Sequence, residues 1–171
     1  MKPSDLTTAE TGTYFSRYTS LVPELSIVEG LNHSSNVLLE TLEPLPSFKW
    51  NYAYAEGKWT IKELLLHLID TERIFVNRAL RFARKDTTPL PGYEENDYAA
   101  TCLANNRSAD SLVKEYKAVR ASTESFFGNL NEEQLLSIGT SGGNQISVRA
   151  IGYLLAGHDL HHLTVIKERY L

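Results

Sequence analysis

The sequence predicts an all-α protein, a four-helix bundle with a long connection between its second and third helices. Three observations indicate this class. Four stretches repeat apolar residues at helical spacing, capping or turn residues separate them, and no stretch of length alternates as a strand would. The 171 residues suffice for one sizeable core, so we expect a single domain over residues 1–171, with residues 1–20 as a polar arm. Tyr14, Phe15 and Tyr18 are expected to pin this arm to the body.

The sequence predicts approximate limits for the first two helices. The first is expected at about residues 24–43, and the aromatic-rich residues 44–59 are expected to cover an end of the bundle. The second is expected at about residues 60–84. It opens on the clearest start signal in the chain, a capping box in which Thr60 and Glu63 each satisfy a backbone amide.

The second half of the chain predicts two more helices. Residues 85–107 hold several turn signals and are too long for a tight hairpin, which indicates a crossover connection or a lid. The third helix is expected to begin after Ser108 and to end at about Asn129. The glycine-rich run 139–144 lacks the lysine of a phosphate loop and is interpreted as a flexible linker. The fourth helix is expected from near Ser147 to the C-terminus.

Two glycines lie inside the fourth predicted helix. Gly152 and Gly157 each cost ~1 kcal/mol relative to alanine in a helix interior. We therefore expect a close approach of another helix there, from this chain or from a second one.

The bulk composition restricts the partners and the location. A net charge of −4 argues against a nucleic-acid binder, which would normally show a basic face. No stretch has the apolar run of a signal peptide or of a membrane span. The single cysteine, Cys102, excludes an internal disulfide and favours the reducing cytoplasm.

Histidines are the side chains that point to chemistry. His158 and His162 lie four residues apart, in the middle of the apolar stripe of the fourth helix. His161 falls well to one side of that stripe. His67 lies at the flank of the apolar stripe of the second helix and leans inward, whereas His33 falls on a polar face and is expected to be solvated.

Two interpretations of the inward histidines remain open. Neutral imidazoles bind zinc, nickel, copper or iron, and three such ligands leave a coordination position open, as in catalytic sites. The alternative is a bundle without metal, whose core histidines are satisfied by hydrogen bonds. Asp70, Asp159 and Asn36 are candidates for holding the other ring nitrogens. The stretch is not an HExxH motif, because Asp159 follows His158, and no G-x-S-x-G elbow exists.

Several motifs together resemble the DinB-like superfamily over nearly the whole chain. The second helix opens with a W-[ST]-x-x-E-x-x-x-H pattern, and a late H-x-x-x-H pair follows in the fourth. The segments that carry the resemblance are Tyr18–Pro23, Lys58–Arg73, Leu90–Tyr93 with Asn96 and Tyr98, and Ala156–His162.

This resemblance implies a divalent metal, zinc or nickel in the first place, held by His67, His158 and His162. It also implies a homodimer and a metal-dependent enzyme acting on a small-molecule substrate. Members of this superfamily include S-transferases that use bacillithiol or mycothiol and a thiol-dependent maleylpyruvate isomerase. We therefore expect a low-molecular-weight-thiol S-transferase or a related hydrolase or isomerase. The alternative is a non-catalytic metal-binding or stress-response bundle. Arg78 could meet an acidic cofactor group, but a packing or salt-bridge role is favoured.

Overall fold

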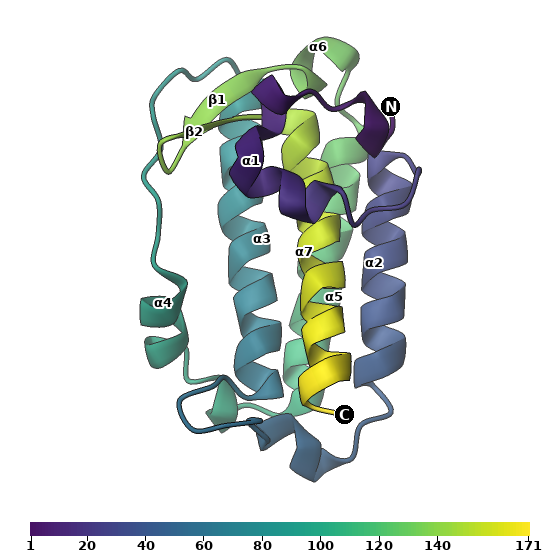
Figure 1. The fold of residues 1–171 in the computed structure, drawn as a ribbon, viewed down its shortest axis with the longest axis vertical. Helices are drawn as coiled ribbons and strands as arrows, with labels where there is room; N and C mark the ends of the chain where they lie inside the picture. Colours follow the sequence, from purple (N-terminus) through teal and green to yellow (C-terminus); the bar gives the residue numbers. More distant parts are fainter.

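Seven α-helices and one two-stranded sheet make up the protein, seen here in a computed structural model that describes all residues 1–171 (Figure 1). Four long helices form the bundle: α2 (Ile27–Leu42), α3 (Ile61–Ala83), α5 (Ala109–Gly128) and α7 (Val148–Arg169). The predicted class is thus confirmed, and each helix ends within three residues of its expected limits. None of the helices is both long and apolar enough to cross a membrane. Three short 3-10 helices lie at Pro3–Asp5, Ser47–Asn51 and Ala104–Asn106.

The four long helices pack in a closed ring in which α2 contacts α7, α7 contacts α3, α3 contacts α5 and α5 contacts α2. In Figure 1, α2 and α7 run downward while α3 and α5 run upward. Because α3 and α5 are parallel, the connection between Arg84 and Ser108 must return along the length of the bundle. It carries the short helix α4 (Glu95–Thr101) and is the crossover that the sequence predicted. A single turn, α6 (Glu132–Leu135), follows α5.

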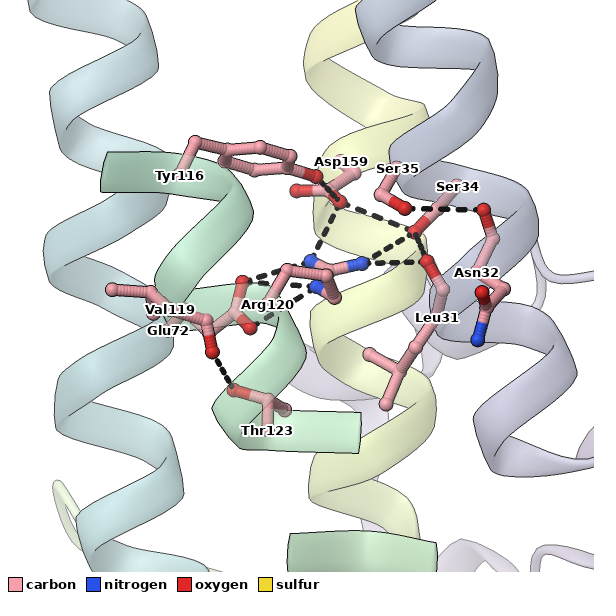
Figure 2. Close-up of polar contacts among 10 residues, drawn as sticks. All are labelled: Leu31, Asn32, Ser34, Ser35, Glu72, Tyr116, Val119, Arg120, Thr123 and Asp159. Carbon is pink, nitrogen blue, oxygen red and sulfur yellow. Dashed lines mark hydrogen bonds and ion pairs between the residues drawn. The ribbon is translucent and has the colours of Figure 1, made fainter. Parts of the chain in front are cut away.

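The core consists of two apolar clusters with a buried polar network between them. Figure 2 shows this network. Arg120 of α5 is at its centre and is 3% exposed. Its guanidinium forms ion pairs with Glu72 of α3 at 2.8 Å and with Asp159 of α7 at 2.7 Å, and it donates to Ser34 Oγ of α2 at 3.0 Å. The hydroxyl of Tyr116 donates to Asp159 at 2.6 Å. This network joins all four long helices and fixes how they are rotated against one another.

The N-terminal arm is more ordered than the sequence predicted. It forms a helix, α1 (Thr8–Thr19), which crosses α7 on the outside of the bundle (Figure 1). Phe15 is buried edge-to-face against Phe75, and Tyr18 reaches the histidines of α7. Tyr14, by contrast, is 50% exposed. The Thr-rich sequence gives little sign of this helix because packing on α7, rather than an apolar repeat of its own, stabilises it.

The glycine-rich run is a β-hairpin rather than a flexible linker, so this expectation was wrong. β1 (Ile138–Ser141) pairs antiparallel with β2 (Asn144–Ser147). The turn places Gly142 at φ 56° and Gly143 at φ 80°, which suits a two-residue turn of the hairpin type. Strands of four residues are too short to show a clear alternation in sequence. The Leu90 amide also donates to the hairpin, at Thr140 O, so the hairpin holds the crossover connection in place.

The close approach expected at the two helix glycines occurs within this chain. A Cβ at Gly157 would overlap the backbone carbonyl of Tyr18 in α1. At Gly152, a Cβ would clash with Ile27 of α2. The glycines therefore let α1 and α2 approach α7, and they need no second chain to explain them.

We expect Gly157→Ala to destabilise the protein by at least about 1–3 kcal/mol, because rigid backbone rather than a flexible side chain occupies the space. Gly128→Ala is the matched control, since its Cβ would meet only Val28 Cγ2 at an ordinary 3.7 Å. Urea unfolding of both variants measures the difference. Equal free energies of unfolding would contradict the close contact between α1 and α7.

An ion pair fastens α1 to the start of α7, and it should make stability depend on pH. Arg149 donates to both carboxylate oxygens of Glu10, at 2.6 and 2.7 Å, and this contact lowers the pKa of Glu10 to about 2. A lowered carboxyl pKa contributes stability above the unfolded-state pKa, near 4.5, and that contribution disappears as the pH falls towards 2. Glu10→Gln should therefore lower the free energy of unfolding by about 2 kcal/mol at pH 7. This difference from wild type should become smaller below pH 5. Denaturant unfolding at pH 7, 5 and 3 tests this, and a constant difference would contradict it.

Candidate metal centre

Three histidines from two helices meet inside the bundle. His67 projects from α3, while His158 and His162 project from successive turns of α7. The Nε2 atoms of His67 and His158 are 3.2 Å apart, and those of His162 and His158 are 3.1 Å apart. All three candidate ligand atoms lie within 4.8 Å of one another. The structure thus brings together the three side chains that the sequence singled out.

The other two histidines lie outside this cluster. His33 is exposed on α2, as predicted. His161 is exposed on the side of α7, where its ring lies edge-on to Tyr18 with centroids 5.4 Å apart. The helical wheel thus correctly predicted that His161 lies to one side of His158 and His162.

None of the three candidate supporting residues bonds to a histidine. Asp159 belongs to the polar network around Arg120. Asp70 lies 3.9 Å from Arg73 on the partly exposed side of α3, and Asn36 is exposed. The expectation that one of them holds a ring nitrogen was therefore wrong: Asp159 is engaged by Arg120 and Tyr116, and neither Asp70 nor Asn36 forms a hydrogen bond with a histidine.

Burial keeps the cluster neutral. Desolvation lowers the pKa of His67 to about 4. Desolvation, with the neighbouring rings adding to it, lowers the pKa of His162 to about 3 and holds the pKa of His158 well below its usual range. Near neutral pH all three imidazoles are therefore uncharged, which is the form that binds a metal ion.

The geometry fits a divalent metal. Bonds of about 2.0–2.1 Å to a tetrahedral centre place two nitrogens about 3.3 Å apart, close to the Nε2 separations of His158 from His67 and from His162. In addition, His162 Nδ1 is the one buried side-chain nitrogen or oxygen without a hydrogen-bond partner. The Nε2 atom of the same ring lies 3.1 Å from Nε2 of His158, so the two imidazoles contact each other through the atoms that would bind a metal ion.

The cluster forms part of the wall of a cleft with a volume of about 510 Å³. The cleft is bounded by α1, α3, α7, the crossover connection and the turn of the β-hairpin. Its other lining residues include aromatic and polar side chains, namely Tyr14, Phe15, Tyr18, Trp59, Thr71, Phe75, Tyr93, Ser141 and Asn144. A small molecule in this cleft would lie next to the side chains of the three histidines.

Sequence reasoning missed several of these lining residues. Trp59, expected only to cover the end of the bundle, lies against His67 with ring centroids 4.8 Å apart. Tyr93 comes from the crossover connection, and its hydroxyl lies 2.7 Å from Thr71 Oγ1 of α3. Trp59 and Tyr93 stand in segments that carry the family resemblance, and this was the available signal that they line the site. Where their side chains lie, however, depends on how the connecting segments fold against the bundle.

Fold and site together define a class of four-helix bundles with a three-histidine cluster in the wall of a cleft. The sequence matches the family model of the DinB superfamily over residues 31–166. This match covers well over half of the chain, which therefore belongs to the DinB superfamily.

Three known proteins are similar to this chain. A protein of Oceanobacillus iheyensis, OB0413, whose name proposes a metal-dependent hydrolase, is 28% identical over 155 residues, covering 85% of this chain and 88% of its own. YfiT from Bacillus subtilis, described in the same terms and as an unusual four-helix bundle, superposes with a TM-score of 0.73 at 16% identity, covering 83% of this chain and 82% of its own. A mycothiol-dependent maleylpyruvate isomerase superposes with a TM-score of 0.66 at 15% identity, covering 96% of this chain and 62% of its own. At these identities the two structures support the shared fold.

Proposed function

We propose that this protein is a metal-dependent enzyme of small-molecule chemistry, and specifically a low-molecular-weight-thiol S-transferase or a related hydrolase or isomerase. The observation that carries this proposal is the convergence of three neutral imidazoles on one point of an accessible cleft. His67, His158 and His162 would hold the metal. A purely structural role would not require the cluster to face a cleft of this size.

A divalent metal in this position supplies Lewis-acid chemistry, because it lowers the pKa of a bound thiol or water. The residues of the chain provide the surroundings. Trp59 and Tyr18 lie against the histidine rings and restrict their orientation. Phe15, Phe75 and Leu154 give the cleft apolar walls that would limit water around a reacting group.

Several finer features belong to the same proposal. We propose zinc or nickel as the metal, since three histidine nitrogens suit both. The homodimer rests on the family resemblance alone, because contacts within the chain account for Gly152 and Gly157. The cytoplasm is proposed as the location, since the chain has a single cysteine, Cys102.

The test is activity of zinc- or nickel-loaded protein against two panels. One combines cysteine, glutathione, bacillithiol or mycothiol with 1-chloro-2,4-dinitrobenzene, where a C–S bond forms and chloride leaves. The other contains activated esters and amides. We expect turnover that depends on both metal and a member of one panel, and a loss of at least about 100-fold in His67→Ala.

His33→Ala is the matched control, because His33 is exposed on α2 and should leave turnover unchanged. Thiol-dependent conjugation supports the transferase, and hydrolysis without thiol supports the hydrolase. Stoichiometric metal binding without turnover in either panel would contradict both the transferase and the hydrolase and would favour a metal-binding bundle.

A further inference from the structure

Arg78 of α3 is a buried cation without an acidic partner. The residue is 6% exposed and forms no ion pair, so the salt bridge considered for it does not exist. Its single hydrogen bond runs from Nη2 to the carbonyl oxygen of Pro91 at 2.8 Å. The guanidinium otherwise lies against two aromatic rings, with its carbon 4.6 Å from the centroid of Phe75 and 5.8 Å from that of Tyr93. Most of the five N–H groups of this guanidinium therefore have no acceptor in the protein. The nitrogens without a partner are not fully buried, and Arg78 lines the cleft, so a ligand can reach them.

Burying Arg78 without a carboxylate is unfavourable for its charged form. Burial lowers the pKa of Arg78, because desolvation disfavours the charged form and no carboxylate compensates it. The other buried arginine, Arg120, is paired with two acids, Glu72 and Asp159. A buried guanidinium that lacks such a partner has the properties of a binding group awaiting an anion.

Arg78 and the metal cluster share one face of α3 and one cleft. Eleven residues separate His67 from Arg78, which brings them back to within about 20° around the helix and about 16 Å apart along its axis. Thr71 and Phe75 lie between them, and all four residues line the cleft. Side chains on a helix lean towards its N-terminus, and the long side chain of Arg78 reaches back over the ring of Phe75, in the direction of His67.

The charges around the cleft favour an anion. Two cations, Arg17 and Arg78, line it, together with one carboxylate, that of Glu95. Glu95 is exposed in α4 and forms no ion pair with either arginine. Arg17 lies at the exposed rim, whereas Arg78 is buried, where an ionic hydrogen bond is stronger.

We propose that the cleft takes an elongated small molecule whose carboxylate, or similar planar anionic group, binds Arg78 while its metal-binding end lies at the three histidines. Arg78 is then a specificity-determining residue for the substrate or cosubstrate. The inference depends on the proposed function for the metal-binding end only. The anion site itself rests on Arg78 and its surroundings.

The experiment uses zinc-loaded protein and two thiols of equal length, 8-mercaptooctanoic acid and 8-mercapto-1-octanol, with affinities measured by calorimetry. Wild type should bind the acid at least about tenfold more tightly than the alcohol, since only the acid can form ionic hydrogen bonds with the guanidinium. Arg78→Met should bring this ratio close to one, and Arg78→Lys should retain part of it. Arg81→Met is the control. Arg81 lies on the same helix as Arg78 but is already paired with Asp86 at 2.6 Å, so its loss should leave the ratio unchanged.

Within each variant, the ratio of the affinities for acid and alcohol distinguishes loss of anion binding from loss of the Pro91 contact. Losing that contact alone would weaken the binding of both thiols equally. An equal affinity of wild type for the acid and the alcohol would overturn the proposal. So would an acid preference that persists in Arg78→Met.

A second arm uses metal-free protein with octanoate and 1-octanol, and it keeps the two proposals distinguishable. If zinc does not bind but octanoate is preferred in an Arg78-dependent way, the proposed metal function fails and the anion site stands. If zinc binds and neither arm shows an Arg78-dependent preference for the acid, the anion site is wrong and the metal function stands.

Discussion

His158→Ala is expected to weaken zinc or nickel binding by at least about 100-fold while leaving the helical content unchanged. His158 is the central member of the cluster, since its Nε2 lies within 3.2 Å of the Nε2 atoms of both His67 and His162. Losing a partner that only supports a ligand typically costs 10–100-fold in metal affinity, so losing a direct ligand should cost more. Competition with a chromophoric chelator measures the affinity, and circular dichroism monitors the fold.

His161→Ala is the matched control for this prediction. It removes an imidazole three residues along the same helix, but one that is exposed and points to the side of the cluster. We expect wild-type affinity for this variant. Equal affinities of the two variants would show that the metal binds somewhere other than the cluster.

Arg120→Met is expected to destabilise the fold by about 3–5 kcal/mol, because it leaves the carboxyl groups of Glu72 and Asp159 buried without their cation. Glu72 lies on α3 and Asp159 on α7, and each residue is only 2% exposed. Figure 2 shows that no other cation reaches them among the residues drawn. Urea unfolding of wild type and variant at pH 7 gives the difference in free energy.

Lys117→Met provides the comparison on the same helix. Lys117 pairs with Glu43 at 2.6 Å, but the two side chains are 52% and 48% exposed, so the loss should stay below about 1 kcal/mol. Adding Glu72→Gln and Asp159→Asn to Arg120→Met should recover part of the stability, because buried neutral amides cost less than unpaired charges. Similar losses for Arg120→Met and Lys117→Met would contradict the account of the network.

The sequence allowed the bundle and the three histidines to be predicted because both depend on helical periodicity. A spacing of four residues places His158 and His162 on one face whatever the rest of the chain does. The position of His67 relative to them follows once two amphipathic helices share a core. The aromatic side chains around the site could not be placed, since they come from α1 and the crossover connection, whose paths depend on tertiary packing.

The buried network had a signal in the sequence that was not used. Glu72 and Arg120 each occupy a position on an apolar stripe, four residues after Leu68 and Tyr116 respectively. Opposite charges on the inner faces of two helices indicate a buried pair. Asp159 was instead considered as a partner for a histidine, because the rotation of α7 that turns it towards Arg120 is not visible in a single helix.

Diffraction from crystals grown with zinc or nickel, recorded at the absorption edge of the metal, tests the central claim most directly. The account predicts one anomalous peak in the cleft, about 2.0–2.1 Å from the Nε2 atoms of His67, His158 and His162, with further density from water or a ligand at an open position. The contradictory result is a metal-loaded crystal with no peak between these three atoms, with their Nε2 atoms still in contact with one another.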